Sequence, residues 1–255
     1  MRTGIIQGRL TPPHKGFQEC PKDWTREFDL LESLSLTHIE WIVTKKHFKE
    51  NPIFHEDVSK YNVNSICADN LVDAKFNKKE YFFQNMVPIC NTAINNEIKN
   101  ITIPLLEESS VTHNMVRKQV CSYLKELSEM YKDLSFSIEA ELEPDKLDEI
   151  ININDNFMIT YDTGNVTSFG LNHEEYIYRF GDKINNVHLK DRTFDAKTVF
   201  PLMGDTDFKQ IFKYLNKINY DGVFTLQTAR GPTGQEINTI TKHKSIFEEL
   251  YNEYA

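Results

Sequence analysis

The stretch Ile101-Thr102-Ile103-Pro104-Leu105-Leu106 is a short apolar run with almost no alternation between apolar and polar residues. A strand covered on one face only would alternate, whereas a strand covered on both faces reads as a nearly continuous apolar run. The run therefore predicts a buried strand of a parallel sheet.

Similar runs recur along the chain, and helical patterns separate them. Strands are expected over residues 4–7, 38–43, 63–68, 100–104, 134–139, 157–161, 184–189 and 222–226. Apolar residues three and four positions apart predict helices over 24–34, 79–95, 116–131, 144–151, 174–180, 207–217 and 235–254. A further helix near 45–61 has the weakest pattern. Asp23 and Asp207 stand at expected N-caps, and Pro144 at a first turn.

The number of units favours a closed barrel. Eight strand-then-helix units follow one another without a linker or a change in composition, and about 250 residues is the usual size of such a barrel. Gly8-Arg9-Leu10 after the first strand lacks the glycine-rich pattern of dinucleotide-binding sheets. We therefore expect an α/β protein, a (β/α)8 TIM barrel that forms a single domain over residues 1–255.

Composition narrows the class of partner. The formal net charge is -9, which disfavours a protein that grips nucleic-acid phosphates. No signal segment opens the chain, and no apolar stretch approaches the roughly 18 residues of a membrane span. The four cysteines are scattered and are expected to be reduced thiols. These features predict a cytoplasmic protein with neither a membrane nor a nucleic-acid partner, and leave a homo-oligomer open.

Polar residues gather where the expected strands end, which is where barrels carry their active sites. Glu139, Asp162 and His188 follow or end three successive strands, and neighbouring strands are about 4.8 Å apart. Two carboxylates and an imidazole suit one divalent ion such as Mn²⁺, Co²⁺, Zn²⁺ or Mg²⁺. Taken singly, each of these acids could instead pair with a nearby Lys or Arg. Their matched positions favour a shared cation site.

Arginines and further acids stand at other strand ends. Arg192 and Arg230 follow the last two strands, and their guanidinium groups suit a phosphate or carboxylate. Ion pairing with Asp191 or Asp162 is the alternative for both. Glu40 and Asp69 are expected either to order the site or to face solvent. The histidines at other positions form no ligand pair and are expected on the surface rather than as ligands, with His14, in the loop after the first strand, as the one exception.

These segments together resemble the sugar phosphate isomerase/epimerase family, the xylose isomerase-like TIM barrels. The specific matches are Tyr161-Asp162-Thr163-Gly164-Asn165 and Val187-His188-Leu189-Lys190-Asp191-Arg192, and others run nearly from end to end, including Gln7-Gly8-Arg9, Ile39-Glu40-Trp41, Ala68-Asp69 and Ile138-Glu139. The resemblance implies substrate contacts from Arg9, Glu40, Asp69, Lys190, Arg192 and Arg230.

The resemblance also implies a metal site of four ligands, in which two glutamates move the proton. The first three positions are Glu139, Asp162 and His188, and the fourth, which is also the second catalytic position, is Gln227. A glutamine oxygen can bind a metal, but the neutral amide cannot act as a base. One-base chemistry such as aldose–ketose isomerisation through an enediol stays open to Glu139.

Three functions follow, in order of preference. The first is a metal-dependent isomerase or epimerase of a small sugar or sugar phosphate. The second is a sugar-binding relative with no activity or altered chemistry, which the loss of the second glutamate suggests. The third is a metal-dependent hydrolase or lyase on the same barrel.

Overall fold

The computed structural model describes residues 1–14 and 20–254. Eight parallel strands form one closed barrel in the order β1-β10-β7-β6-β5-β4-β3-β2. The strands are β1 (Thr3–Ile6), β2 (Ile39–Ile42), β3 (Val63–Cys67), β4 (Asn100–Leu105), β5 (Ser135–Ala140), β6 (Phe157–Asp162), β7 (Ile184–Leu189) and β10 (Val223–Leu226). The predicted (β/α)8 TIM barrel is therefore confirmed.

Helices alternate with the strands. They are α1 (Trp24–Ser33), α2 (Lys79–Asn95), α3 (Asn114–Met130), α4 (Pro144–Ile151), α5 (Thr163–Ser168), α6 (His173–Phe180), α7 (Phe208–Lys217) and α8 (Glu236–Tyr254). A two-stranded hairpin, β8 (Asp191–Arg192) and β9 (Thr198–Val199), follows β7. Within the described ranges, every helix is too short or too polar to cross a lipid bilayer.

The segment after β2 differs from the prediction. In place of the helix expected near 45–61 it forms two short 3₁₀ turns, η1 (Phe48–Glu50) and η2 (Pro52–Phe54). Pro52 disfavours a helical conformation at Asn51, whose side chain instead accepts hydrogen bonds from Trp41 Nε1 at 2.9 Å and from Ile53 N at 3.2 Å. Three more 3₁₀ turns, η3 (Asp69–Leu71), η4 (Glu107–Ser109) and η5 (Gly181–Lys183), complete the element order.

Helix starts follow the sequence at all three expected positions. The Asp207 side chain accepts a hydrogen bond from Gln210 N at 3.1 Å, and Pro144 opens α4. Asp23 occupies the expected N-cap position of α1, but its side chain makes no capping hydrogen bond.

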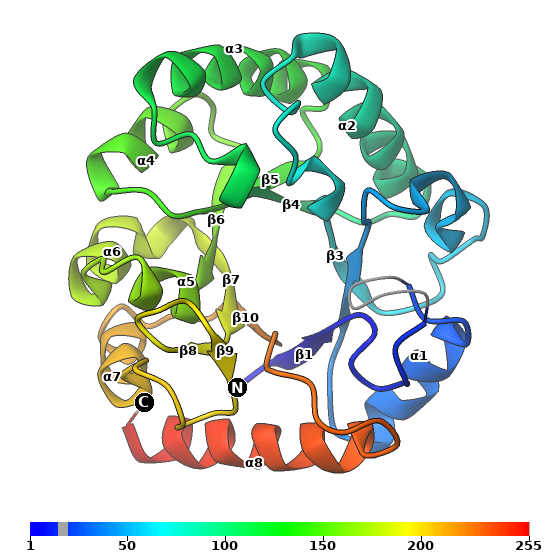
Figure 1. Cartoon of the computed structure of the whole chain (residues 1–255), viewed down its shortest axis with the longest axis vertical. Coiled ribbons are helices and arrows are strands. Elements are labelled where there is room, and N and C mark those ends of the chain that lie inside the picture. Colours follow the sequence, from blue (N-terminus) through cyan, green and yellow to red (C-terminus); the bar gives the residue numbers. More distant parts are fainter. Residues whose placement is uncertain (15–19, 255) are drawn as a thin grey trace. The chain divides into compact units, whose positions relative to one another are not determined.

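The chain groups into two compact units, so the single domain over residues 1–255 stays a prediction. The first unit joins Met1–Pro13 and Pro21–His38 to the chain from Thr160 onward. Its strands β1, β10 and β7 pair in register, with Ile5 opposite Leu226 and Leu226 opposite Leu189. Helices α7 and α8 lie side by side in gold and red (Figure 1). Phe208 and Phe247 join them through rings 4.9 Å apart.

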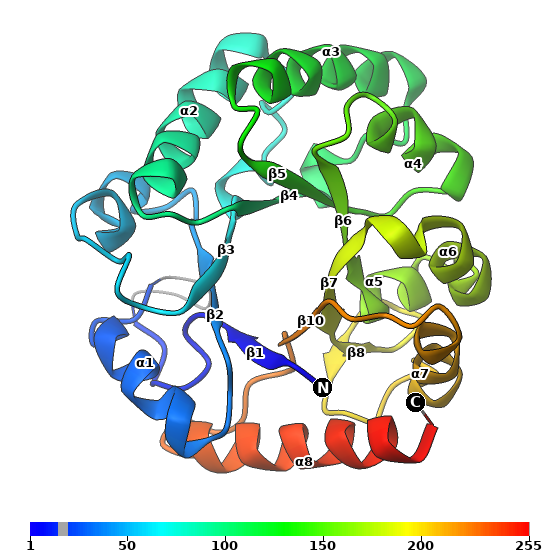
Figure 2. The same cartoon turned by 180° about the vertical axis from the view of Figure 1, so that it is seen from behind.

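The second unit is built mainly from Ile39–Ile159. Strands β2 to β5 pair in parallel, and α2 and α3 lie outside β4 and β5 in both views (Figure 1 and Figure 2). Phe82 and Tyr123 join these helices with ring centroids 5.8 Å apart. The strand residues are almost all buried, as the apolar runs predict.

A half-buried histidine holds α5 and α6 to the end of β6. The Thr167 hydroxyl donates to Thr163 O at 2.8 Å, so it accepts from His173 Nε2 at 3.0 Å. His173 Nδ1 then accepts from the Tyr161 hydroxyl at 2.5 Å. The neutral imidazole that carries its proton on Nε2 satisfies both ring nitrogens. Burial lowers the pKa of His173 to about 4.

This histidine predicts an acid-sensitive fold. The unfolded chain takes up a proton near pH 6.5 and the folded chain only near pH 4. The free energy of unfolding should therefore fall as the pH drops through this window, by about 3 kcal/mol for this residue. Urea unfolding at pH 7 and pH 4.5 should show a smaller difference in His173→Gln than in the wild type. His113→Gln, an exposed position, should keep the wild-type difference; an equal difference in all three proteins would contradict the assignment.

Candidate active site

Asp162 ends β6 and begins α5, and both of its carboxylate oxygens are engaged. Oδ1 accepts from Asn165 N at 2.9 Å, and Oδ2 lies 2.6 Å from Lys190 Nζ. The side chain is buried. Burial raises the pKa of Asp162, but the charges of Lys190 and His188 and the hydrogen bonds outweigh it, and the pKa lies below its ordinary value. Asp162 is therefore an anion at neutral pH.

The end of β7 is fastened to the start of α5. The Thr163 hydroxyl lies 2.7 Å from Lys190 O and 3.1 Å from His188 O, and it accepts from Lys190 N at 3.0 Å. Gly164 lies beside this contact, where a Cβ would come within 3.0 Å of Lys190 Cγ and Arg192 Cγ. A glycine thus lets the helix approach both cationic side chains closely.

His188 and Glu139 complete the group of predicted ligands. His188 is fully buried on β7, and its Nδ1 lies 3.9 Å from Asp162 Oδ2. Glu139 is buried on β5, where it pairs in register with Pro104. Each of the three residues offers one ligand atom, and these atoms lie within 4.8 Å of one another.

The donor set fits a divalent cation. Such ions bind carboxylate oxygen and imidazole nitrogen at about 2.0–2.2 Å, so two ligand atoms on one ion can lie about 4 Å apart. Buried carboxylates are costly unless a cation compensates them. Lys190 supplies one positive charge to Asp162, and a divalent ion held by the three ligand atoms would add further positive charge to this buried group. The residues therefore fit Mn²⁺, Co²⁺, Zn²⁺ or Mg²⁺.

Gln227 follows β10, and its backbone N donates to Leu189 O at 3.1 Å. Its Oε1 is buried and, among the described residues, has no hydrogen-bond partner. A buried amide oxygen without a partner costs free energy, which is consistent with a ligand or metal reaching it.

Three arginines follow β1, β7 and β10. Arg9 is 4% exposed, and its Nε donates to Thr228 O at 3.4 Å. Burial, and then the charge of Arg230, lower the pKa of Arg9 to about 9, against an opposing effect of Glu27. Arg192 is half-buried and donates from Nη1 to Ser168 Oγ at 3.4 Å.

In the part of the chain that the structure describes, Asp191 and Asp162, the alternative partners of Arg192 and Arg230, contact other groups. Asp191 accepts from Gly204 N at 2.9 Å and Thr206 N at 3.3 Å, and Asp162 pairs with Lys190. Asp191 thus shapes the loop that follows the β8–β9 hairpin.

Glu40 and Asp69, two further predicted site residues, lie in the second unit, as Glu139 does. Glu40 is fully buried on β2 and pairs in register with Ser65, so the alternative of a solvent-facing Glu40 is wrong. Asp69 is half-buried and begins η3.

The buried role of Glu27 on α1 was not predicted from the sequence. It is buried, and its carboxylate accepts from Gly8 N at 2.7 Å, Leu10 N at 2.9 Å, and Thr11 N and Oγ1 at 3.0 Å. Burial nevertheless raises its pKa. The available signal was a charged residue four positions before Leu31, on the buried stripe of the helix.

Two histidines expected on the surface are also buried. His38 contacts Thr37 and Thr225 at 2.8 and 3.3 Å, and its ring leaves no room for a Cβ at Gly4. His243 Nδ1 lies 2.8 Å from Thr228 Oγ1. Both are satisfied core histidines.

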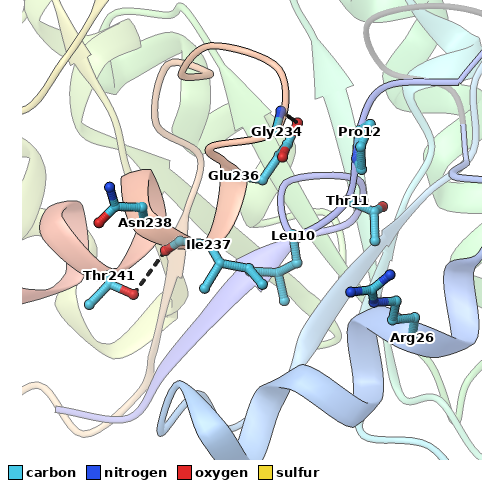
Figure 3. Close-up of a pocket in the computed structure, with 9 residues that line it drawn as sticks. All are labelled: Leu10, Thr11, Pro12, Arg26, Gly234, Glu236, Ile237, Asn238 and Thr241. Carbon is cyan, nitrogen blue, oxygen red and sulfur yellow. Dashed lines mark hydrogen bonds between the residues drawn. The ribbon is translucent and has the colours of Figure 1, made fainter.

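A cavity of about 530 Å³ lies in the first unit, between the loop after β1 and the start of α8. Figure 3 shows the side chains of Leu10 and Ile237 near the middle of the view, with those of Arg26 and Glu236 apart from each other. The predicted site residues are not among those that line it.

Comparison with known proteins places this geometry in a family. No curated protein matches the chain in sequence. Among solved structures, the IolI protein with a binding zinc atom is 17% identical with a TM-score of 0.76, covering 100% of this chain and 99% of that one. A D-tagatose 3-epimerase-like protein is 17% identical with a TM-score of 0.71, covering 99% of both chains.

A third solved structure has magnesium. It is a xylose isomerase-like TIM barrel protein from Mycobacterium smegmatis, 14% identical with a TM-score of 0.65, covering 99% of this chain and 97% of that one. The family model described as xylose isomerase-like TIM barrel matches residues 69–245, well over half of the chain. The chain therefore belongs to the xylose isomerase-like TIM barrel family.

Proposed function

We propose that this protein is a divalent-metal-dependent isomerase or epimerase of a small sugar or sugar phosphate. The observation that carries the proposal is the buried group of Glu139, Asp162 and His188, whose ligand atoms lie within 4.8 Å of one another. Structures of similar fold are described as a D-tagatose 3-epimerase-like protein, an L-ribulose 3-epimerase and a 3-keto-D-glucoside 4-epimerase. Zinc and magnesium appear in the descriptions of two others.

Glu139, Asp162 and His188 would hold the metal, with Gln227 as a fourth, neutral ligand. When bound, a divalent metal polarises a carbonyl and the adjacent hydroxyl of a substrate. The Glu139 carboxylate would accept the proton from the carbon beside the carbonyl, which leaves an enediolate. The same carboxyl group would return the proton to the original carbon, or to the neighbouring carbon while the hydroxyl proton passes to the former carbonyl oxygen. Lys190 keeps Asp162 oriented and ionised through its 2.6 Å contact.

Gln227 sets the number of bases. An amide cannot accept a proton at neutral pH, so proton transfer on both faces of one carbon lacks its second carboxylate. A single base that moves a proton between two neighbouring carbons does not need a second carboxylate. The proposed site therefore favours aldose–ketose isomerisation over two-base epimerisation.

Replacing Glu139 tests the base. Wild-type protein with Mn²⁺, Co²⁺, Zn²⁺ or Mg²⁺ should exchange the proton beside the carbonyl of at least one sugar in a panel with deuterium, as followed by NMR. Glu139→Gln should slow this exchange by about 10²–10⁴-fold, the usual contribution of a general base. Glu143→Gln, an exposed position close by in the chain, should leave it unchanged. Absence of both metal binding and exchange would sink the proposal.

The second candidate, a sugar-binding relative without isomerase activity, is favoured by Gln227 itself. Gln227→Glu separates the two. Because the variant adds an anionic ligand, we expect at least tenfold tighter metal binding by calorimetry, since even outer-shell changes alter affinity about 10–100-fold. Deuterium exchange already present in the wild type supports the isomerase, whereas exchange seen only in Gln227→Glu identifies the natural protein as the binding relative.

A further inference from the structure

Arg9 and Arg230 occupy matched positions beyond two neighbouring strands. Ile5 on β1 and Leu226 on β10 are partners in the parallel register. Each arginine comes four residues after its partner residue. The two loops therefore bring both guanidinium groups to the same edge of the first unit.

A direct contact joins the two loops. Arg9 reaches from the loop after β1 to the loop after β10, where its Nε donates to Thr228 O at 3.4 Å. Thr228 lies two residues before Arg230 and is itself held by His243 at 2.8 Å. A guanidinium group carries five N–H donors, so a contact that orients it is compatible with binding an anion as well. The pair is thus prepositioned on a buried framework.

Two acids in the described part of the chain act on the pair and also accept hydrogen bonds from the backbone. Glu27 and Glu236 are the carboxylates that oppose the charge of Arg230, and Glu27 also opposes that of Arg9. Glu27 accepts from the amides of Gly8, Leu10 and Thr11, and Glu236 from Gly234 N at 3.0 Å. These acids fix the loops that carry the arginines. The repulsion between the two cations is evident in the pKa of Arg9, which burial and Arg230 lower to about 9.

The same edge holds more positive charge. Leu226 also pairs with Leu189 on β7, and Arg192 comes three residues after Leu189. Three neighbouring strands, β1, β10 and β7, are therefore each followed by an arginine, in a chain whose net charge is -9. Forked guanidinium groups recognise the paired oxygens of phosphates and carboxylates.

We propose that Arg9 and Arg230 together form an anion subsite, so that the sugar on which this protein acts carries a phosphate or carboxylate group. The substrate assignment rests on the proposed isomerase function, whereas the anion subsite stands on the arginine geometry. The anionic group is held over β1 and β10, and the reacting carbons extend toward the ends of β6 and β7. A neutral sugar of the same length lacks this anchor.

Binding of inorganic phosphate to metal-free protein tests the subsite without any reaction. Calorimetry should show phosphate binding to the wild type that weakens at least tenfold in Arg230→Gln. Arg9→Gln should weaken it similarly, and Arg230→Gln, at a half-buried position, serves if the Arg9 variant does not fold. Arg26→Gln, an exposed arginine on α1, is the matched control and should bind phosphate like the wild type. No phosphate binding, or equal binding by all four proteins, overturns the subsite.

Deuterium exchange with neutral sugars, sugar phosphates and sugar acids tests the substrate class. We expect exchange with an anionic sugar, competitive inhibition by phosphate, and a KM that rises in Arg230→Gln more than kcat falls. The phosphate and acid arms identify which anion is used. Equal exchange with neutral and anionic sugars overturns the inference. Arginine-dependent phosphate binding without exchange on any sugar supports the subsite and instead rejects the proposed isomerase function.

Discussion

The buried ion pair between Asp162 and Lys190 is the contact on which the arrangement of the first unit's polar edge depends. Two charges removed from water are tolerated only when they compensate each other and their remaining valences are satisfied. Their 2.6 Å contact meets that requirement together with Asn165, whose backbone N donates to Asp162 and whose Oδ1 accepts from Lys190 Nζ at 3.4 Å. The ends of β6 and β7 are thereby fixed to α5, and His188 is held beside an aspartate that stays ionised.

Some acidic residues of the first unit hold loops in place through backbone hydrogen bonds, and Asp162 also belongs to the proposed active site. Glu27 and Asp191 accept from backbone amides of the loops that follow β1 and the β8–β9 hairpin. Asp162 does both, since one oxygen caps a helix while the other meets Lys190 and faces His188. The side chains proposed to meet the substrate are thus carried by segments that other carboxylates hold in place.

The pattern of apolar residues in the sequence was sufficient to predict the barrel. Apolar runs such as 100–105 indicate parallel strands that are covered on both faces. The pattern was insufficient after β2, where Asn51 and Pro52 favour local hydrogen bonds over a helix. The ligand positions could be named because strand ends are readable from the chain. Glu27 could not, since its role depends on amides from a loop distant in sequence, and neither could the burial of His38 and His243. The roles of the named site residues stay predictions.

The hydrogen bonds of the Glu27 carboxylate restrict which insertions and deletions this chain can tolerate during evolution. Surface loops usually accept inserted or deleted residues freely. Here the Glu27 carboxylate accepts hydrogen bonds from the amides of Gly8, Leu10 and Thr11. Arg9, in the same loop, and Arg230 each come four residues after a strand residue that pairs with the other strand. A one-residue insertion between Ile6 and Thr11 would break both relationships at once. The length of this loop is therefore as restricted as its composition, and length variation among descendants should fall elsewhere.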